Sequence, residues 1–147
     1  MHSFILKKKP HSFNANRGKK KDNYIAHIRG SFKSFYSEHT RLNGDLYGSL
    51  YYFYKKDLGL DTDNLSKPIW DSLSDFLYQD DKQIKLRIAG SFDISKNDFK
   101  ILDISGLPGN LLTALLDAFD TEDHIVYIEC GILHHSMYKF NLVFNGN

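Results

Sequence analysis

The sequence predicts a single α+β domain with a mixed or antiparallel sheet and helices packed on it. Segments with the spacing of strands and of helices follow one another along the chain, and 41% of the residues are hydrophobic and 14% aromatic. A length of 147 residues suits one domain with a well-formed core. No apolar run approaches the roughly 20 residues that a membrane span needs, so we expect no membrane partner.

The number of cysteines bears on the cellular compartment of the protein. The single cysteine, Cys130, excludes an internal disulfide and is typical of proteins in the reducing cytoplasm. We expect Cys130 to be a small buried apolar residue at a strand end. The first residues have too short an apolar core for a secretory signal, and their lysines follow that core instead of preceding it. These features together predict a cytoplasmic protein.

Charge is distributed unevenly along the chain. Residues 1–56 carry 12 Lys and Arg against 3 Asp and Glu, whereas residues 57–147 carry 7 against 15. A basic half beside an acidic half suits a metal-dependent nuclease, because cations bind the phosphate backbone while carboxylates bind the metal. Charge runs usually mark only a solvated surface, so the asymmetry favours nucleic acid without establishing it.

The first part of the chain predicts a strand, a helix and a longer strand. Residues 3–7 have strand character and are followed by Pro10, which ends the strand. A basic loop containing Lys19 to Lys21 leads to residues 23–38, where apolar side chains recur at helical spacing. Residues 46–54 are dense in Tyr, Leu and Phe and predict a strand. We expect its side chains to alternate between two faces, with Tyr52 and Tyr54 opposite Tyr51 and Phe53.

The second part predicts further elements of both kinds. We expect a helix over residues 65–78, with Pro68 in its first turn and a buried stripe formed by Ile69, Leu73, Phe76 and Leu77. Later helical spacing covers residues 110–119. Expected strands cover residues 83–88, 99–104, 125–128 and 138–144. The leucines of the later helix, Leu111, Leu112, Leu115 and Leu116, suit either a dimer interface or the core of one monomer.

Acidic residues gather on either side of the helix over 65–78. Asp61 and Asp63 precede it, and Asp80 and Asp81 follow it. If the first pair lies on an extended strand end, the period of two aims both carboxylates the same way, and the helix can return Asp81 to them. Converging carboxylates repel one another, so such an arrangement normally needs a divalent cation or a proton to hold it together. Oxygen-only ligands suit Mg²⁺, or Mn²⁺ as a substitute, better than Zn²⁺.

Two motifs carry a resemblance to a known family. The pattern Asp61-x-Asp63-Asn64-Leu65-x-Lys67-x-x-x-Asp71-x-Leu73, followed by Asp80-Asp81-x-Gln83-Ile84, resembles the RusA family of Holliday junction resolvases. The segment Pro10-His11-Ser12-Phe13-Asn14 is similar to a Pro-x-Ser-x-Asn segment near the start of RusA-like proteins. The resemblance is strongest over residues 1–90, and residues 91–147 form a more divergent and longer tail.

The resemblance implies a homodimeric, Mg²⁺-dependent endodeoxyribonuclease that cuts four-way junctions or other branched DNA with paired symmetric nicks. Asp61, Asp63 and Asp81 would bind the metal, which would activate a water, and Lys67 would assist cleavage. The supporting residues are Asp80, Asn64 and Asp71. The expected DNA contacts are Lys7, Lys8, Lys9, Ser12, Asn14, Arg17, Lys19, Lys20 and Lys21, with affinity that weakens steeply with salt.

One family feature is missing from the sequence. Family members commonly carry a lysine shortly after the strand over 83–88, and here that stretch reads Ala89-Gly90-Ser91. Lys82, Lys85 or Arg87 could take its place.

Two other functions stay open at this point. The same site could cut other DNA structures, such as flaps or nicked duplex. Alternatively, the chain could be a non-catalytic DNA-binding protein that has kept the fold.

Overall fold

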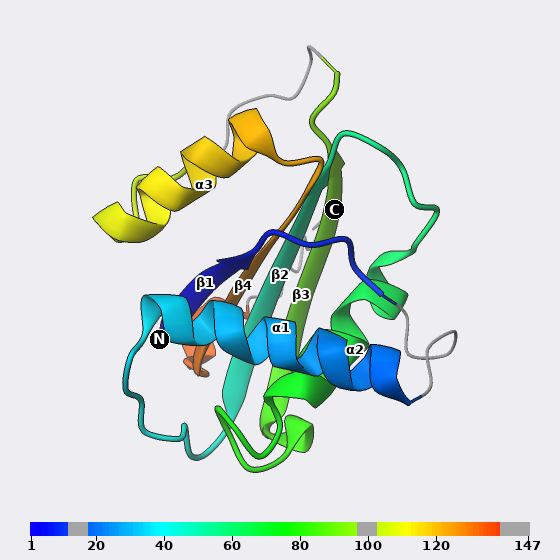
Figure 1. Ribbon diagram of the computed structural model, residues 1–147. Helices are drawn as coiled ribbons and strands as arrows, with labels where there is room; N and C mark the ends of the chain where they lie inside the picture. The colour runs from blue at the N-terminus through cyan, green and yellow to red at the C-terminus, as the bar shows by residue number, and fades with distance from the viewer. Residues whose placement is uncertain (12–17, 97–102, 139–147) are drawn as a thin grey trace, which may run out of the picture.

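A computed structural model describes residues 1–11, 18–96 and 103–138. Four strands and three longer helices alternate along this part of the chain (Figure 1). The strands are β1 (His2–Leu6), β2 (Leu46–Tyr54), β3 (Ile84–Asp93) and β4 (His124–Ile132). The helices are α1 (Lys19–Phe35), α2 (Thr62–Leu73) and α3 (Gly109–Thr121), with short 3₁₀ turns η1 (Asp81–Gln83) and η2 (His135–Met137). The predicted α+β class is confirmed.

The strands form one sheet in the order β1-β4-β2-β3. β4 pairs antiparallel with both β1 and β2, while β2 and β3 pair in parallel. The sheet is therefore mixed, which is one of the two predicted arrangements. β4 lies between β1 and β2, so a strand from the C-terminal tail completes the centre of the sheet.

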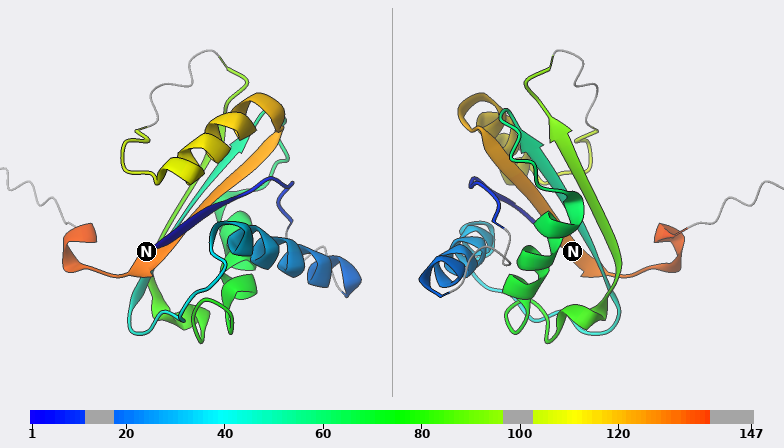
Figure 2. Two further views of the ribbon diagram at one scale, coloured as in Figure 1. Left: turned by 60° about the vertical axis from the view of Figure 1, so that its left-hand side comes forward. Right: turned by 90° about the vertical axis from the view of Figure 1, so that its right-hand side faces the viewer.

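The sheet separates two hydrophobic clusters. α1 and α2 pack on one face with Leu50 and Tyr52 of β2, and α3 packs on the other face with Phe53 (Figures 1 and 2). Successive side chains of a strand point to opposite faces, and this alternation divides β2 between the clusters. Tyr54 packs with Tyr52, and Tyr51 packs with Phe53, so the predicted alternation is confirmed.

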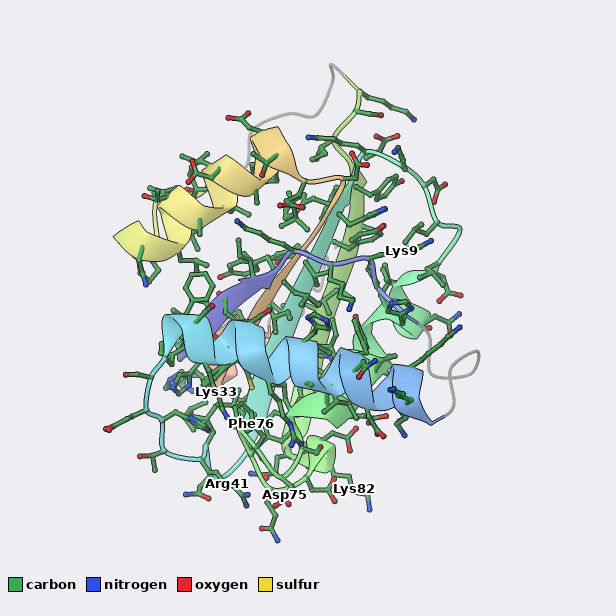
Figure 3. All side chains as sticks on the ribbon, in the orientation of Figure 1. Lys9, Lys33, Arg41, Asp75, Phe76 and Lys82 are labelled. Atoms are coloured by element: carbon green, nitrogen blue, oxygen red, sulfur yellow. The ribbon has the colours of Figure 1, made fainter. Side chains whose placement is uncertain are left out.

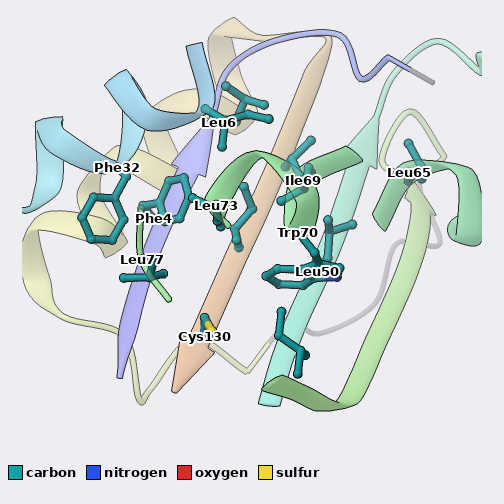
Figure 4. Packing of buried hydrophobic residues seen from close by; sticks show 14 of the residues in the cluster. Phe4, Leu6, Phe32, Leu50, Leu65, Ile69, Trp70, Leu73, Leu77 and Cys130 are labelled. Atoms are coloured by element: carbon teal, nitrogen blue, oxygen red, sulfur yellow. The ribbon is translucent and has the colours of Figure 1, made fainter. Parts of the chain in front are cut away.

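Trp70 of α2 is the largest fully buried side chain and approaches the sheet very closely (Figure 4). A Cβ atom added to Gly48 of β2 would lie 2.8 Å from two atoms of the indole ring. Glycine is therefore required at this position of β2, because any side chain would enter the space of the ring. Trp70 was not part of the buried stripe predicted for this helix.

α1 begins earlier than predicted. Lys19 to Lys21 form its first turn and do not lie in a loop, and Gly18 precedes them with φ 72°. Lysine is a good helix former, whereas a positive φ favours glycine, so these residues suit the observed start. α1 ends at Phe35, where Tyr36 takes an extended conformation.

Arg29 of α1 links the two helices of this face. Its Nε donates to the carbonyl oxygen of Ser72 at 2.9 Å, and its Nη2 donates to that of Ser74 at 3.1 Å. Its guanidinium also lies over the ring of Phe76, which Lys33 approaches as well (Figure 3). The carbonyls at a helix C-terminus lack intrahelical partners, so Arg29 satisfies two orphan acceptors at the end of α2.

α2 is displaced toward the N-terminus relative to the prediction. It starts at Thr62 and ends at Leu73, where Ser74 is extended and Asp75 has φ 58°. Pro68 therefore lies inside the helix and not in its first turn, and the helix continues to Leu73 although Pro68 has no N–H to donate. Leu77 is fully buried, but it lies in the turn that follows the helix.

The C-terminal elements agree with the prediction where the structure describes them. α3 and β4 cover the predicted ranges 110–119 and 125–128 and extend beyond them. Leu111 and Leu115 are buried in the monomer core, whereas Leu116 is 46% exposed. The predicted strands over 99–104 and 138–144 lie mainly outside the described residues. Asp103, Ile104 and Tyr138, which are described, are not in strands.

Cys130 is buried, as predicted, although it lies inside β4 and not at a strand end. Burial raises the pKa of its thiol to about 12, so the thiol is protonated at neutral pH. Of the described helices, none combines the length and the apolar character that a membrane span requires.

Candidate functional site

Asp61 and Asp63 lie at the N-terminus of α2. The Asp61 carboxylate accepts a hydrogen bond from the backbone N–H of Asn64 at 2.9 Å, which makes Asp61 the N-cap of the helix. Asp63 lies in the first turn and is exposed. The helix dipole favours both carboxylates at this end. The pair does not lie on an extended strand end, because residues 55–60 separate it from β2.

A turn in the intervening loop explains this difference. The Asp57 carboxylate accepts a hydrogen bond from the N–H of Gly59 at 2.8 Å, and Gly59 has φ 66°. This local bond and the left-handed glycine turn the chain away from the direction of β2. The turn is indicated by the sequence Asp57-Leu58-Gly59, which the expectation of an extended strand end did not take into account.

Lys67 lies one helical turn after Asp63 and forms an ion pair with Asp71. Its Nζ lies 3.3 Å from Oδ2 of Asp71, and the lysine side chain is 69% exposed. An exposed pair of this kind stabilises a helix by only about 0.3–0.5 kcal/mol. The amino group is therefore held only weakly and is accessible to a ligand.

Asp80 has a structural role in the turn before β3. Its carboxylate accepts a hydrogen bond from the N–H of Lys82 at 2.9 Å, and the Gln83 side chain accepts one from the N–H of Asp80 at 3.2 Å. This reciprocal arrangement is a capping box. It fixes the start of η1, and η1 carries the next residue, Asp81.

Asp81 is bound to Arg87 of β3. The Nη2 of Arg87 donates both to the Asp81 carboxylate at 2.9 Å and to the Asp81 carbonyl oxygen at 3.0 Å. Burial by itself raises the pKa of the Asp81 carboxyl, but the hydrogen bond and charge of Arg87 outweigh it and hold the pKa below its usual value. The charge of Lys67 acts in the same direction, so α2 and η1 share one electrostatic environment.

The three predicted metal ligands differ in their partners. Asp61 caps α2, Asp81 pairs with Arg87, and the Asp63 side chain has no hydrogen bond or ion pair among the described residues. Across residues 1–11, 18–96 and 103–138, no three His, Cys, Asp or Glu side chains form a group that could hold a metal ion. Carboxylate oxygens suit Mg²⁺, but their arrangement here does not form a closed ligand set. The metal site stays a prediction.

Arg87 belongs to this site, although the sequence indicated it only as one of three replacements for a missing lysine. No simple spacing rule predicts a contact between residues six apart here, because the contact between Arg87 and Asp81 depends on the path of the chain from η1 into β3. The alternation of side chains along β3 could have indicated on which face of the sheet Arg87 lies. It places Arg87 on the face opposite Leu86 and Ile88, and this is the face that α2 covers.

Basic side chains from two predicted DNA-binding segments meet around His11. Burial lowers the pKa of the His11 imidazole, and the charges of Lys8, Lys9 and Lys20 lower it further. The segment after β1 and the first turn of α1 are therefore close together in space. We call these three lysines, together with Lys56, which like Lys9 acts on His124, the basic patch.

Two lysines of the basic patch lie near His124, the first residue of β4. The pKa of the His124 imidazole is lowered mainly by burial, and the charges of Lys9 and Lys56 lower it further while Asp123 opposes them. The charge of Lys9 acts on both imidazoles, so Lys9 links the two groups of cations. Lys56 and His124 were not among the predicted DNA contacts.

The other predicted DNA contacts are placed as follows. Lys7, Lys19 and Lys21 are exposed. Ser12, Asn14 and Arg17 lie outside the described residues.

Comparison with known protein families shows to which family the chain belongs. The family model for endodeoxyribonuclease RusA matches residues 14–101, more than half of the chain. The chain belongs to the RusA family. The matched residues include Asp61, Asp63, Lys67 and Asp81, while α3 and β4 lie beyond them. No curated protein matches the chain.

Membership in the RusA family implies an endodeoxyribonuclease that acts on Holliday junctions. The roles of individual residues do not follow from the family match. The predicted catalytic and metal-binding residues therefore stay predictions, although α2 and η1, which carry them, are in contact.

Proposed function

We propose that this chain is a Mg²⁺-dependent endonuclease that resolves four-way DNA junctions by paired symmetric nicks, in recombination and repair in the cytoplasm. The observation that carries the proposal is the family match over residues 14–101, which contains every acidic residue of the candidate site. The positions of Asp61 and Asp63 support it, because both carboxylates lie on the surface where DNA can reach them.

We assign Asp61, Asp63 and Asp81 as the ligands of Mg²⁺, with Mn²⁺ as a possible substitute. Asp61 uses one oxygen to cap α2 and keeps the other, and Asp63 is exposed. The helix cap orients Asp61, and the capping box of Asp80 orients the turn that carries Asp81. We therefore assign Asp80 and Asn64 positioning roles.

Lys67 is the residue that we expect to act directly on the reacting phosphate. Its amino group is exposed, lies one turn from Asp63 and shares the electrostatic environment of Asp81. A positive charge there can offset the negative charge that develops on a phosphate during cleavage. Asp71, its ion-pair partner, would hold the amino group near this position before DNA binds.

The basic patch supports DNA binding. Lys8, Lys9 and Lys20 come from two separate segments, and the charges of all three act on the imidazole of His11, which supports the proposal that they bind phosphates together. Their charges would bind the phosphate backbone without reading sequence, and affinity would fall steeply as salt rises. We propose Lys56 as an additional member of this phosphate-binding surface.

Two nicks related by symmetry need two sites related by symmetry. We therefore propose a homodimer with one site in each subunit, since most homodimers have a two-fold axis. Leu116 of α3 is exposed and could take part in an interface, whereas Leu111 and Leu115 are used in the core of the monomer.

A panel of DNA substrates tests the proposal. Purified protein and Mg²⁺ are incubated with a four-way junction, a flap, a nicked duplex and a linear duplex of the same sequence. We expect preferential cutting of the junction, with nicks at symmetric positions in two opposing strands. Equal cutting of linear duplex and junction would refute the resolvase function while leaving a nuclease.

A non-catalytic junction-binding protein is the second candidate. The observation in its favour is that Asp81 is paired with Arg87, and that no three-ligand group is present among the residues that the structure describes. Tight junction binding without any cutting, at all Mg²⁺ and Mn²⁺ concentrations tested, would favour this candidate.

A further inference from the structure

A cavity of about 430 Å³ lies on the sheet face that α3 covers, opposite the face of α1 and α2 (Figure 2). Tyr51, Phe53 and Tyr127 give it an aromatic lining, and Leu107 and Leu115 add aliphatic surface. Sites for small molecules have such a volume and are mostly apolar, with a few polar groups that orient the ligand. The cavity therefore has the size and the lining of a small-molecule site.

Glu129 of β4 brings an oriented carboxylate to this lining. Tyr47 donates a hydrogen bond to its Oε1 at 2.6 Å, and Tyr127 donates one to its Oε2. Burial and the contact with Glu129 raise the pKa of both tyrosines, so both hydroxyls keep their protons at neutral pH. Two charge-assisted hydrogen bonds, one to each oxygen, hold the carboxylate in a fixed orientation.

The carboxylate of Glu129 has no ion pair in the part of the chain that the structure describes. Its two hydrogen-bond donors are neutral phenols, which orient the negative charge without cancelling it. The N-terminal ammonium of Met1, which also lines the cavity, lies too far away to pair with it. Glu129 is half-buried, and a carboxylate in such surroundings is stabilised by a cation.

A second carboxylate, that of Asp103, also lines the cavity. It accepts hydrogen bonds from the N–H and the hydroxyl of Ser105, at 3.0 and 2.7 Å. Two carboxylates beside one cavity give it a negative potential, which attracts cations and repels anions.

The aromatic lining favours an organic cation over a metal ion. Tyr51 and Tyr127 are cross-strand partners, and their rings stack with centroids 6.0 Å apart. Aromatic faces attract ammonium groups, and apolar surface binds the body of a ligand. A divalent metal needs several oxygen ligands, whereas no group of three His, Cys, Asp or Glu that could hold a metal occurs among the described residues.

We propose that this cavity binds a small organic cation, an ammonium group on an aromatic or aliphatic body, and that Glu129 contacts the ammonium group. Tyr47 and Tyr127 are positioning residues, because they act on the ligand through the carboxylate. The site is separate from the acidic residues of α2 and η1, and it does not depend on the nuclease function.

Nuclear magnetic resonance titrations of the ¹⁵N-labelled protein test the proposal. The two probes are phenethylammonium and 2-phenylethanol, which have the same shape and differ in charge. We expect phenethylammonium to cause saturable shifts of the backbone amides of Ser105, Gly106 and Glu129. It should bind about tenfold more tightly than 2-phenylethanol, because only the cation forms a charge-assisted hydrogen bond with the carboxylate.

Glu129→Gln is the variant that removes the charge and keeps one acceptor oxygen for the tyrosines. It should abolish the preference for phenethylammonium and leave the affinity for 2-phenylethanol unchanged. Asp117→Asn is the matched control, because it changes the net charge equally at an exposed position of α3 that does not line the cavity. This control should keep the preference, and melting curves establish that both variants are folded.

Three results would overturn the proposal. Equal affinity of the wild-type protein for the two probes would refute the role of charge, and this comparison needs no variant. Saturable shifts only at residues away from the cavity, or none at all, would refute the site. A folded Glu129→Gln protein that keeps the preference would refute the assignment of Glu129.

Discussion

The Asp61 carboxylate accepts a hydrogen bond from the backbone N–H of Asn64 at 2.9 Å and thereby caps α2. One side chain thus combines a structural role with a proposed catalytic one. The cap holds Asp61 at the end of the helix that also carries Asp63 and Lys67, so the folding of α2 positions these three residues together. Substitutions at Asp61 must separate the two roles.

Asp61→Asn and Asp61→Ala should have different effects on stability and the same effect on cleavage. Asparagine caps a helix as well as aspartate does, whereas alanine loses the cap and about 1 kcal/mol of the free energy of unfolding. Both remove the carboxylate and should abolish junction cleavage. Urea unfolding and a cleavage assay check this, and an Asp61→Asn variant that cuts like the wild type would remove Asp61 from the site.

Gly48→Ala should destabilise the fold. The added Cβ would lie 2.8 Å from the ring of Trp70, and overpacking a core costs about 1–3 kcal/mol. Gly30→Ala is the control, because an added Cβ in α1 has no heavy atom within 4 Å and alanine favours a helix by about 0.5–1 kcal/mol. Urea titrations should show changes of opposite sign, and equal stability of the two variants would contradict the packing of Trp70 on β2.

Lys67→Ala should lower the rate of junction cleavage by about 100-fold or more while leaving junction binding nearly unchanged. Loss of the exposed ion pair with Asp71 should reduce stability by less than about 0.5 kcal/mol. Asp71→Asn breaks the same pair and keeps the lysine, so it should retain much more activity. Single-turnover cleavage measures both effects. Similar losses in the two variants would show that the pair matters and not the charge of Lys67.

The pH dependence of stability should involve His124. Burial lowers the pKa of its imidazole, and Nδ1 lies 2.8 Å from the hydroxyl oxygen of Tyr52. Below the ordinary pKa of 6.5, the unfolded chain binds a proton that the folded protein binds less readily. Acid therefore favours unfolding, and stability should fall as the pH drops below this value.

His124→Gln should reduce that loss of stability between about pH 7.5 and 5. It should not abolish the loss, because burial also lowers the pKa values of His2 and His11. Melting temperatures across this range measure the slope. His135→Gln, at an exposed position, serves as the control, and an unchanged slope in His124→Gln would contradict the assigned role.

The parts of the fold that depend on local pattern could be predicted from the sequence. β2 has the predicted bounds because its aromatic and aliphatic residues form a continuous segment, and α3 includes the whole predicted helix. The start of α2 was misplaced by three residues because apolar spacing marks its buried stripe, while its first turn is polar and is defined by the Asp61 cap.

Contacts between distant segments could not be predicted from such patterns. Arg29 binds carbonyl groups 43 and 45 residues away, at the end of α2, and no spacing rule in the sequence indicates this contact. The pairing of Arg87 with Asp81 depends on the path of the chain from η1 into β3. The acidic residues of the candidate site could be named from their spacing, whereas the cation that holds one of them required the structure.

Cleavage of a four-way junction by Asp63→Asn, beside the wild type, tests the central claim most directly. Asp63 has no hydrogen bond or ion pair through its side chain among the described residues, so this substitution should change the chemistry without disturbing the fold. The account predicts paired symmetric nicks by the wild type with Mg²⁺, and none with EDTA or with Asp63→Asn, while junction binding persists. Nicks by Asp63→Asn at the wild-type rate would contradict the account.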